Sequence, residues 1–502
     1  MATGPVPLTQ PRLGRASLAA LDARVSRPAY DFTTVGAGIV HLGVGAFMRA
    51  HLAVYCDDVL QSGDNWAIAG FSLRRPDVCR QLEPQDCLYT VRVGAETSVY
   101  RLIAALRSIG VTPEDPGATV DCLASPATRV VTITVTEKGY CIDPHRGGLA
   151  AEHPDIVHDL AHPAKPRSLV GILYAACRQR RDRHTGGFTV LSCDNLPSNG
   201  ALLRRAVLDY AALAGGELGG WIERNVAFPS SMIDRIVPAT TPEDIANAAA
   251  VTGVVDEALV CTEPFTQWVI EDNFPHGRPR WEDAGALLVP DVAPYEAAKL
   301  RLLNGAHSTL AYLGYLAGYP YVHEVMGDPV LSGFVERMMV REISPVTPEP
   351  EGMEHGDYIA ELLQRFRNPS LQHRTWQIAM DGSQKLPQRL LASIREQRKA
   401  GGLHDGLCVA VAAWMRYVLG TDEQGGRIDV SDPLAGTFAR IDSDCGDDDA
   451  AIVARFLAID SVFPADLAGD TAFAATLQQR LAELRQFGAR ETARRFLENE
   501  TT

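Results

Sequence analysis

The chain carries two kinds of hydrophobic pattern, and one gives way to the other near residue 290. In the first half, short apolar and β-branched runs are separated by segments of helical length, and these runs lie at residues 39–42, 66–73, 129–136 and 188–193. Such an alternation predicts a parallel β-sheet with crossover helices. Residues 253–264 and 286–290 are candidates for further strands.

The second half has helical periodicity and few strand signals. Its helical segments are 295–318, 328–343, 356–367, 386–400, 404–420, 448–459 and 472–498. A chain of 502 residues is too long for one ordinary core, so at least two domains are expected. We therefore predict an α/β domain over residues 1–290 and a mainly α-helical domain over residues 291–502.

A glycine turn follows the first of the β-type runs. Residues 39–42 lead into Gly43-Val-Gly45-Ala-Phe47, after which apolar residues continue at helical spacing. A strand, a glycine turn and a helix start are the parts that place a pyrophosphate on backbone N–H groups. Met48 stands where the third glycine of a Gly-x-Gly-x-x-Gly fingerprint would be, so the fingerprint is incomplete. A glycine turn without a ligand is the alternative interpretation.

Lys299, Asn304 and His307 recur at steps of five and three in the helical segment 295–318. In a regular α-helix they fall within an arc of about 140°. One face would then carry a potential base, an amide donor and an imidazole. That set suits the removal of a proton from an alcohol while its oxygen is polarised. A solvated polar face is the alternative.

Composition excludes several classes of partner. The chain has 47 Lys and Arg against 62 Asp and Glu, and the formal net charge of −15 argues against nucleic acid or an anionic membrane surface. No apolar run approaches the about 18–20 residues of a membrane helix. The ten cysteines include no Cys-x-x-Cys pair, which is typical of reduced thiols in a cytoplasmic protein. His323-Glu324 and Glu354-His355 lack the spacing of a zinc site, so we expect no metal.

Other polar residues follow β-type runs or interrupt helical ones. Glu137 and Asn195 come directly after two of the runs, and the carboxyl ends of parallel strands line the ligand crevice of such sheets. Asp234 lies among apolar residues beside Arg235, and a structural ion pair is the alternative to a binding role. Arg374 and Lys385 flank a polar turn that either lines a substrate pocket or ends a helix.

Five of these stretches, taken in order, resemble the polyol-specific long-chain dehydrogenase/reductase family, which includes mannitol 2-dehydrogenase, arabinitol dehydrogenase and fructuronate reductase. The resemblance runs from about residue 37 to beyond 430. Its motifs are Gly-x-Gly-Ala-Phe-x-Arg-Ala-His at 43–51, Thr-Val-Thr-Glu-Lys-Gly-Tyr at 134–140, Ser-Cys-Asp-Asn at 192–195, Met-Ile-Asp-Arg-Ile-Val-Pro at 232–238 and Lys-Leu-Arg-Leu-Leu-Asn-Gly-Ala-His at 299–307. The resemblance implies a Rossmann-type N-terminal domain and a mainly α-helical C-terminal domain.

Within the family, residues 263–273 and 373–389 are similar to the fructuronate reductase branch. The mannitol enzymes carry an arginine four residues before Asp-Gly-Ser, where this chain has Gln377. The resemblance therefore implies interconversion of D-fructuronate and D-mannonate. A polyol dehydrogenase acting on mannitol or arabinitol is the nearest alternative. A catalytically idle sugar-binding protein is disfavoured because Lys299, Asn304 and His307 are all present.

The resemblance also implies roles for individual residues. Lys299 would be the general acid and base, a role that needs its pKa lowered from the usual ~10.4. Asn304 and His307 would bind the substrate oxygens, with Asn195 assisting at the oxyanion and Asp234 binding a hydroxyl. Glu137 and Glu296 match carboxylates of the proton path between Lys299 and solvent. The residues expected at the cofactor are Gly43, Gly45, Ala46, Phe47, Arg49 and Ser72.

The sequence gives weaker signals for the choice between NAD and NADP and for the contact with a charged substrate. The run 66–73 continues into Arg74-Arg75-Pro-Asp77 without an acid at the strand tip, which alone favours NADP. The branch is generally NAD-linked, so NAD is expected and NADP stays open. A uronate carboxylate needs a cationic contact, for which Arg374 and Lys385 are candidates. The expected partners are thus a small sugar acid or polyol and, at most, further copies of the chain in a small homo-oligomer.

Overall fold

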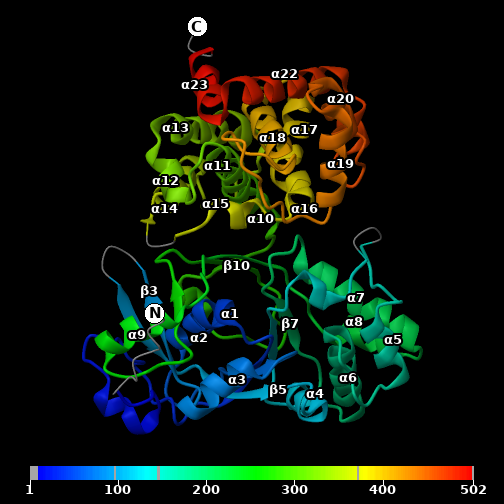
Figure 1. Cartoon of the computed structure of the whole chain (residues 1–502). Helices are drawn as coiled ribbons and strands as arrows, with labels where there is room; N and C mark the ends of the chain where they lie inside the picture. Colours follow the sequence, from blue (N-terminus) through cyan, green and yellow to red (C-terminus); the bar gives the residue numbers. More distant parts are fainter. Residues whose placement is uncertain (1–9, 95–97, 144–146, 370–371, 500–502) are drawn as a thin grey trace. The chain divides into compact units, whose positions relative to one another are not determined.

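A computed structural model describes residues 10–94, 98–143, 147–369 and 372–499. The chain divides into two compact units, Met1–Val292 and Ala293–Thr502, here called the N-terminal and C-terminal units (Figure 1). In the described parts of the chain, no helix is both long and apolar enough to cross a bilayer.

The N-terminal unit is built on a sheet of five parallel strands. In spatial order they are β5 (Leu106–Val111), β2 (Ala67–Ser72), β1 (Ala37–Leu42), β6 (Val130–Ile133) and β7 (Thr189–Ser192). Numbered within this sheet alone, the order is 3-2-1-4-5, the Rossmann order. The chain leaves β1 toward β2 on one side and later returns to β6 on the other, which creates a switch point between β1 and β6.

Helices cover both faces of this sheet because successive strand residues point to opposite sides. Ile39 packs in one core with Met48 and Leu52, whereas its neighbour Val40 packs in another core with Leu173. The helices of this unit are α1 (Ala46–Ala50), α2 (Leu52–Val59), α3 (Asp77–Leu82), α4 (Pro116–Ala124), α5 (Pro154–Ala161), α6 (Leu169–Asp182), α7 (Asn199–Ala214), α8 (Leu218–Asn225) and α9 (Pro242–Thr252). Two-sided burial explains why β1, β6 and β7 consist mostly of apolar and β-branched residues.

The sequence patterns correctly predicted β1, β2, β6 and β7 but not β5. This strand lies at the edge of the sheet and most of its residues are only half-buried, so it carries no continuous apolar run. Two small sheets were also only partly anticipated. One contains β8 (Ser231–Asp234), β10 (Gln267–Glu271) and β11 (Leu287–Val289), and the other β3 (Tyr89–Val93), β4 (Val99–Ile103) and β9 (Val260–Thr262).

The C-terminal unit is helical, and α11 (Asn304–Leu316) and α18 (Asp405–Val418) form its centre. Nearly every residue of both helices is buried, as expected for helices surrounded by others. The remaining helices are α10 (Ala293–Ala298), α12 (Val322–Gly327), α13 (Pro329–Met338), α14 (His355–Phe366), α15 (Thr375–Ala379), α16 (Gly382–Leu386), α17 (Ala392–Ala400), α19 (Ala435–Cys445), α20 (Asp449–Leu457), α21 (Ala465–Ala468), α22 (Thr471–Phe487) and α23 (Ala489–Asn499). The predicted fold class, a Rossmann-type domain followed by a mainly helical one, is confirmed.

The helix predicted over residues 295–318 is not regular. A π-helical turn, Lys299–Leu303, joins α10 to α11, and the N–H of Asn304 donates to the carbonyls of both Lys299 and Leu300. The periodicity of apolar residues contains no signal for this one-residue insertion. Turns of this kind occur frequently at functional sites.

Candidate active site

The N-terminal unit contains a cavity of about 1150 Å³ at the carboxyl ends of its parallel strands. Its walls include Gly43 after β1, Ser72 at the end of β2, Thr112 after β5 and Thr134 after β6. In open parallel sheets this edge, beside the switch point, is where ligands bind. A cavity of this volume can hold most of a ligand the size of a dinucleotide.

Gly43 is the residue at which β1 turns into this cavity. Its φ is +98°, and a Cβ atom there would lie 2.1 Å from the carbonyl oxygen of Thr134. The Gly43 N–H donates to the carbonyl of Phe71 at 2.8 Å, so the turn is held to the strand on its other side as well. Only glycine fits this combination of dihedral angle and close approach.

The remaining residues of the glycine turn have different environments. Gly45 is extended (φ −128°), Ala46 and Phe47 open α1, and none of the three is among the cavity-lining residues. Arg49 is buried: its guanidinium donates to the carbonyls of Gly45 and Ala258, and it stacks on Tyr89. Arg49 therefore holds the turn from inside the unit. Of the six residues expected at the cofactor, Gly43 and Ser72 line the cavity.

His41, one strand position before this turn, is fully buried, and burial lowers its pKa to about 3. Its ring lies 2.9 Å from the Thr132 hydroxyl and 3.0 Å from the Thr134 hydroxyl, which in turn donates to the carbonyl of Gly43 at 2.8 Å. The histidine thus supports the loop that carries the turn.

This buried histidine predicts a loss of stability in mild acid. In the unfolded chain the pKa is ~6.5, so below that pH the unfolded state takes up a proton that the folded state refuses until about pH 3. The unfolding free energy should therefore fall by about 2 kcal/mol between pH 7 and pH 5 on account of this one group. Urea unfolding of wild type and His41→Asn at both pH values measures this contribution. An equal pH dependence in the two proteins would contradict it.

A half-buried carboxylate, that of Asp194, joins the loops that follow β6 and β7. Asp194 accepts hydrogen bonds from the N–H groups of Val135 (2.9 Å) and Thr136 (3.1 Å) and from the Tyr140 hydroxyl (2.6 Å). Burial raises the pKa of Asp194. The predicted residues Glu137 and Asn195 are exposed and directly follow the two segments that Asp194 connects. The motif at 192–195 contains Asp194, but its sequence context does not predict this connecting role.

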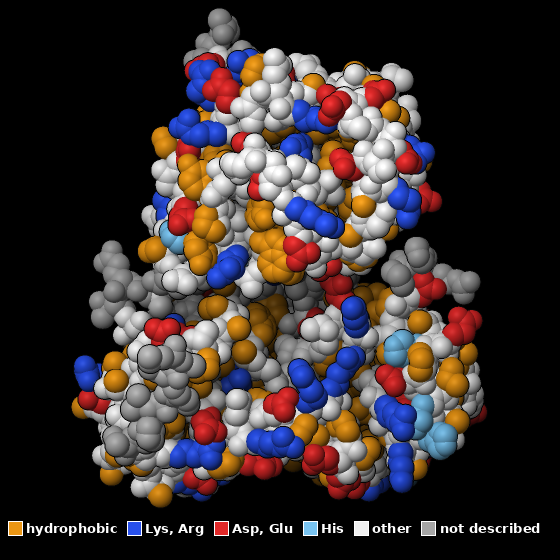
Figure 2. Space-filling model, viewed as in Figure 1, with side chains coloured by type: hydrophobic (Ala, Val, Ile, Leu, Met, Phe, Trp, Pro, Cys, Tyr) orange, Lys and Arg blue, Asp and Glu red, His pale blue; other side chains and the backbone are white. Residues whose placement is uncertain are grey.

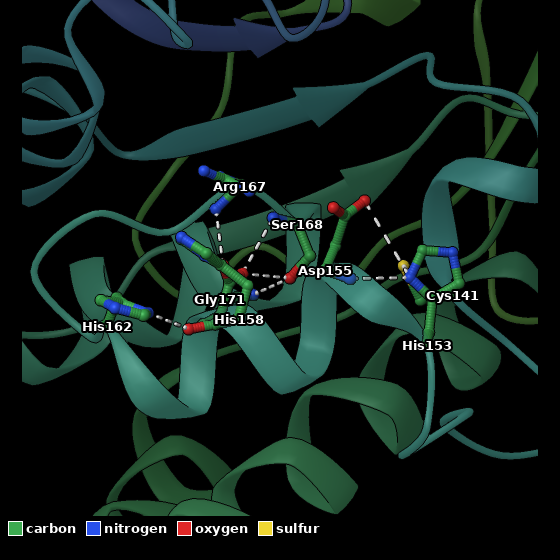
Figure 3. A network of polar contacts seen from close by, with 9 residues as sticks. Cys141, His153, Asp155, His158, His162, Arg167, Ser168 and Gly171 are labelled. Carbon is green, nitrogen blue, oxygen red and sulfur yellow. Dashed lines mark hydrogen bonds and ion pairs between the residues drawn. The ribbon is translucent and has the colours of Figure 1, made fainter.

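Another wall of the cavity is formed by the segment around α5 and the start of α6 (Figure 3). The carboxylate of Asp159 accepts hydrogen bonds from the N–H groups of Arg167 and Ser168, both at 2.8 Å, and from the Ser168 hydroxyl at 2.7 Å. His158 contacts the same carboxylate at 3.0 Å. These bonds fix the loop that places Lys165 and Arg167 at the cavity.

Lys299 and Asn304 lie at the two ends of the π turn in the C-terminal unit. The hydrogen bond from the Asn304 N–H to the Lys299 carbonyl makes them neighbours one turn apart. Both are buried, with 7% of each exposed, as is His307 with 6%. Among the residues that the structure describes, the Asn304 Nδ2 has no hydrogen-bond partner. A buried amide donor in this state is suited to bind an oxygen atom of a ligand.

His307 is the centre of a group of basic side chains. Its ring packs on Phe366 (4.6 Å between centroids) and against His373 (5.2 Å). Burial, followed by the charges of His373, Arg365 and Arg389, lowers the pKa of His307 well below its usual value. The pKa of His373 is lowered as well, by burial and by Lys385. At neutral pH both imidazoles are therefore neutral. We call these five residues the basic cluster: His307, Arg365, His373, Lys385 and Arg389.

The two residues predicted to read a carboxylate differ in position. Lys385 belongs to the basic cluster, and its ammonium group donates to the carbonyls of Ile378 (3.4 Å) and Met380 (2.5 Å). Arg374 is exposed, and its guanidinium lies 5.6 Å from the centre of the Tyr321 ring. Arg389 was missed, although it lies four residues after Lys385, a spacing that places two side chains on one helical face.

The other predicted residues are placed as follows. Glu296 lies in α10, one turn before Lys299, and is half-buried. Asp234 ends β8, pairs in register with Gln267 and is 5% exposed. Within the described ranges, no group of three or more His, Cys, Asp and Glu side chains is arranged to hold a metal ion.

The strand order, the glycine turn and the cavity beside the switch point define a Rossmann-fold protein with an α-helical C-terminal unit. Residues 37–283 match the family model of the mannitol dehydrogenase Rossmann domain, and residues 291–485 match that of the mannitol dehydrogenase C-terminal domain. This chain belongs to the mannitol dehydrogenase family of oxidoreductases, so the resemblance seen in the sequence motifs is confirmed.

The names of similar proteins in the family indicate different substrates. D-mannonate oxidoreductase of Escherichia coli (strain K12) is 44% identical over 474 residues, 93% of this chain and 97% of that protein. Mannitol 2-dehydrogenase of Phaeosphaeria nodorum is 39% identical and covers 94% of this chain and 83% of that protein. The structure of Pseudomonas fluorescens mannitol 2-dehydrogenase, a ternary complex with NAD and D-mannitol, is 37% identical, with a TM-score of 0.86 over 97% of this chain and 99% of that chain.

Proposed function

We propose that this protein is an NAD-dependent oxidoreductase that interconverts D-fructuronate and D-mannonate. The proposal rests on the similarity to D-mannonate oxidoreductase and on one structural observation, the basic cluster around His307. A neutral polyol has no group that needs several cations, whereas the carboxylate of a uronate does.

The cavity of the N-terminal unit is suited to NAD. It lies at the carboxyl edge of a sheet in Rossmann order, and Gly43 lets the backbone turn there without a side chain. Gly45, Ala46 and Phe47 would continue the phosphate-binding turn, with Arg49 supporting it from inside. When bound, NADH would supply the hydride for reduction of the keto group.

Lys299 would act as the general acid in this direction. Its ammonium group would donate a proton to the carbonyl oxygen as that oxygen becomes an alcohol, and the neutral amine would take the proton back in oxidation. The Asn304 Nδ2, which has no partner among the described residues, would donate to the same oxygen. His307 would donate from its neutral imidazole, and Asn195 would assist.

Three carboxylates of the two units have proposed roles in proton transfer or in binding a hydroxyl group. Glu296, one turn before Lys299, and Glu137 would carry the proton between Lys299 and solvent. Asp234 would accept a hydrogen bond from a substrate hydroxyl. No metal is needed in this scheme, because the lysine supplies the positive charge beside the developing alkoxide.

The first test is oxidation of NADH by the purified protein with D-fructuronate, D-fructose and D-tagaturonate side by side. A kcat/KM for D-fructuronate at least a hundredfold above that for D-fructose corresponds to about 2.7 kcal/mol of transition-state discrimination and would support the proposal. A preference for D-fructose would instead support the second candidate, a mannitol 2-dehydrogenase, which the similarity to fungal enzymes of that name favours.

Substitutions of Lys385 and Arg374 test which cation reads the carboxylate. Because Lys385 lies in the basic cluster, Lys385→Met should raise the KM for D-fructuronate by tenfold or more while changing the KM for D-fructose less than threefold. Arg374→Ala tests the other candidate by the same comparison of substrates. Equal effects on the charged and the neutral substrate would exclude carboxylate recognition by the residue concerned.

A further inference from the structure

We propose that the cavity of the N-terminal unit contains a binding site for the 2′-phosphate of an adenine nucleotide, formed by Arg74 and Arg75. The site would let the protein bind NADP(H) in addition to NAD(H). The inference rests on the proposed function in one respect, that the cavity receives a dinucleotide. It extends that proposal to a phosphate for which no residue has been assigned.

Arg74 and Arg75 lie just after the end of the second strand of the sheet. In a Rossmann sheet the second strand ends beside the adenosine ribose, where an acid that binds the 2′-hydroxyl favours NAD and an arginine accommodates a 2′-phosphate. Here β2 ends at Ser72, and Arg74 and Arg75 follow in the cavity wall. The Ser72 hydroxyl donates to the Arg75 carbonyl at 2.6 Å, which fixes the turn that carries both arginines.

Neither guanidinium group is held in a buried ion pair with another described residue. Within the described part of the chain, Arg74 forms no ion pair, and its charge acts on the thiol of Cys141 in the wall beyond β6. Arg75 contacts Asp77 at 3.6 Å, but the two side chains are 84% and 64% exposed. So exposed a pair contributes little to stability, and a dianionic phosphate would compete effectively for Arg75.

The lining of the cavity is more basic than the chain as a whole. The lining contains five Lys and Arg residues against four Asp and Glu, although the chain carries a net charge of −15. Three of the four acids have partners of their own: Asp77 contacts Arg75, Asp155 lies 3.9 Å from the His153 ring, and Asp115 caps α4, where it accepts from the Ala118 N–H at 2.9 Å. Basic side chains, with acidic ones among them, are visible around α3 and α4 in Figure 2. An anionic ligand is therefore favoured more strongly in this cavity than at most of the protein surface.

The experiment compares two nucleotides that differ only in the phosphate concerned. Isothermal titration of wild type should show that adenosine 2′,5′-bisphosphate binds at least tenfold more tightly than adenosine 5′-monophosphate, and that this advantage shrinks in higher salt. In the Arg74→Ala/Arg75→Ala protein the two ligands should bind within threefold of each other. Arg80→Ala, an exposed arginine of α3 outside the cavity lining, is the matched control and should retain the difference.

Two results would overturn the inference. One is equal binding of the two nucleotides to the wild-type protein. The other is a preference that survives in the double variant but disappears in Lys165→Ala/Arg167→Ala, which would place the phosphate at the α5–α6 wall. Melting temperatures of all variants show that each is folded.

The binding measurement is independent of the reaction. If the protein reduces D-fructuronate with NADH but binds the two nucleotides equally, the 2′-phosphate site is wrong and the proposed function stands. If it prefers the bisphosphate but reduces no sugar with either NADH or NADPH, the proposed function is wrong and the phosphate site stands.

Discussion

Replacing Lys299 with methionine should lower kcat for D-fructuronate reduction by about 10²- to 10⁴-fold, the usual contribution of a positioned acid or base. Methionine keeps the length and apolar stem of the side chain but cannot transfer a proton. The neighbouring Asn304 would still bind the carbonyl oxygen, so the KM should change much less than kcat. Steady-state kinetics with saturating NADH measures both quantities.

Lys399→Met is the matched control for this substitution. Lys399 lies in α17, is mostly exposed and pairs with Glu396 at 2.9 Å, so its loss should leave kcat unchanged. Small primary amines added to a Lys299→Ala protein should restore part of the rate, because they can occupy the space of the missing ammonium group. A Lys299→Met protein with more than a tenth of the wild-type kcat would contradict the assigned role.

Gly43→Ala should destabilise the N-terminal unit by about 3 kcal/mol or more. An alanine in the left-handed region costs about 1–2 kcal/mol, and its Cβ, 2.1 Å from the Thr134 carbonyl oxygen, would add the cost of forcing β1 and β6 apart. For a unit of this size the melting temperature should fall by about 6–12 °C. The displaced turn should also lose most of its affinity for NADH, which the fluorescence of the bound cofactor reports.

Gly63→Ala separates the two parts of this effect. Gly63 also has a positive φ, +87°, but a Cβ atom there would meet no other atom within 4 Å. Its substitution should therefore show the dihedral penalty alone, with NADH affinity unchanged. If Gly63→Ala and Gly43→Ala were equally destabilising, the close contact with Thr134 would not be the reason for glycine at position 43.

The local sequence pattern predicts some elements of the fold and misses others. Strands β1, β2, β6 and β7 are predictable because each is buried on both faces and therefore consists mostly of apolar and β-branched residues. The edge strand β5 lacks that signal. The π turn at Lys299 also escaped prediction, because one inserted residue does not alter the apolar character of the helix around it.

The candidate site shows the same division. The motifs identify Gly43, Lys299, Asn304 and His307 by type and spacing. The need for glycine at position 43 follows from the tight turn between strand and helix that its motif predicts. Nothing in the spacing shows that Arg49 turns into the interior. The motifs also do not show that Asp194 connects two loops.

By itself, the sequence determined the family, the α/β and helical halves and the candidate proton-transfer residues, because these depend on patterns within short segments. Only the tertiary structure decided the order of the strands and the position of the cavity. It alone placed Arg365 and Arg389 near His307, Lys385 near His373, and Arg74 and Arg75 in the cavity wall. The physical reason is that contacts between segments distant in sequence depend on packing against a common core, which the local hydrophobic pattern requires but does not specify.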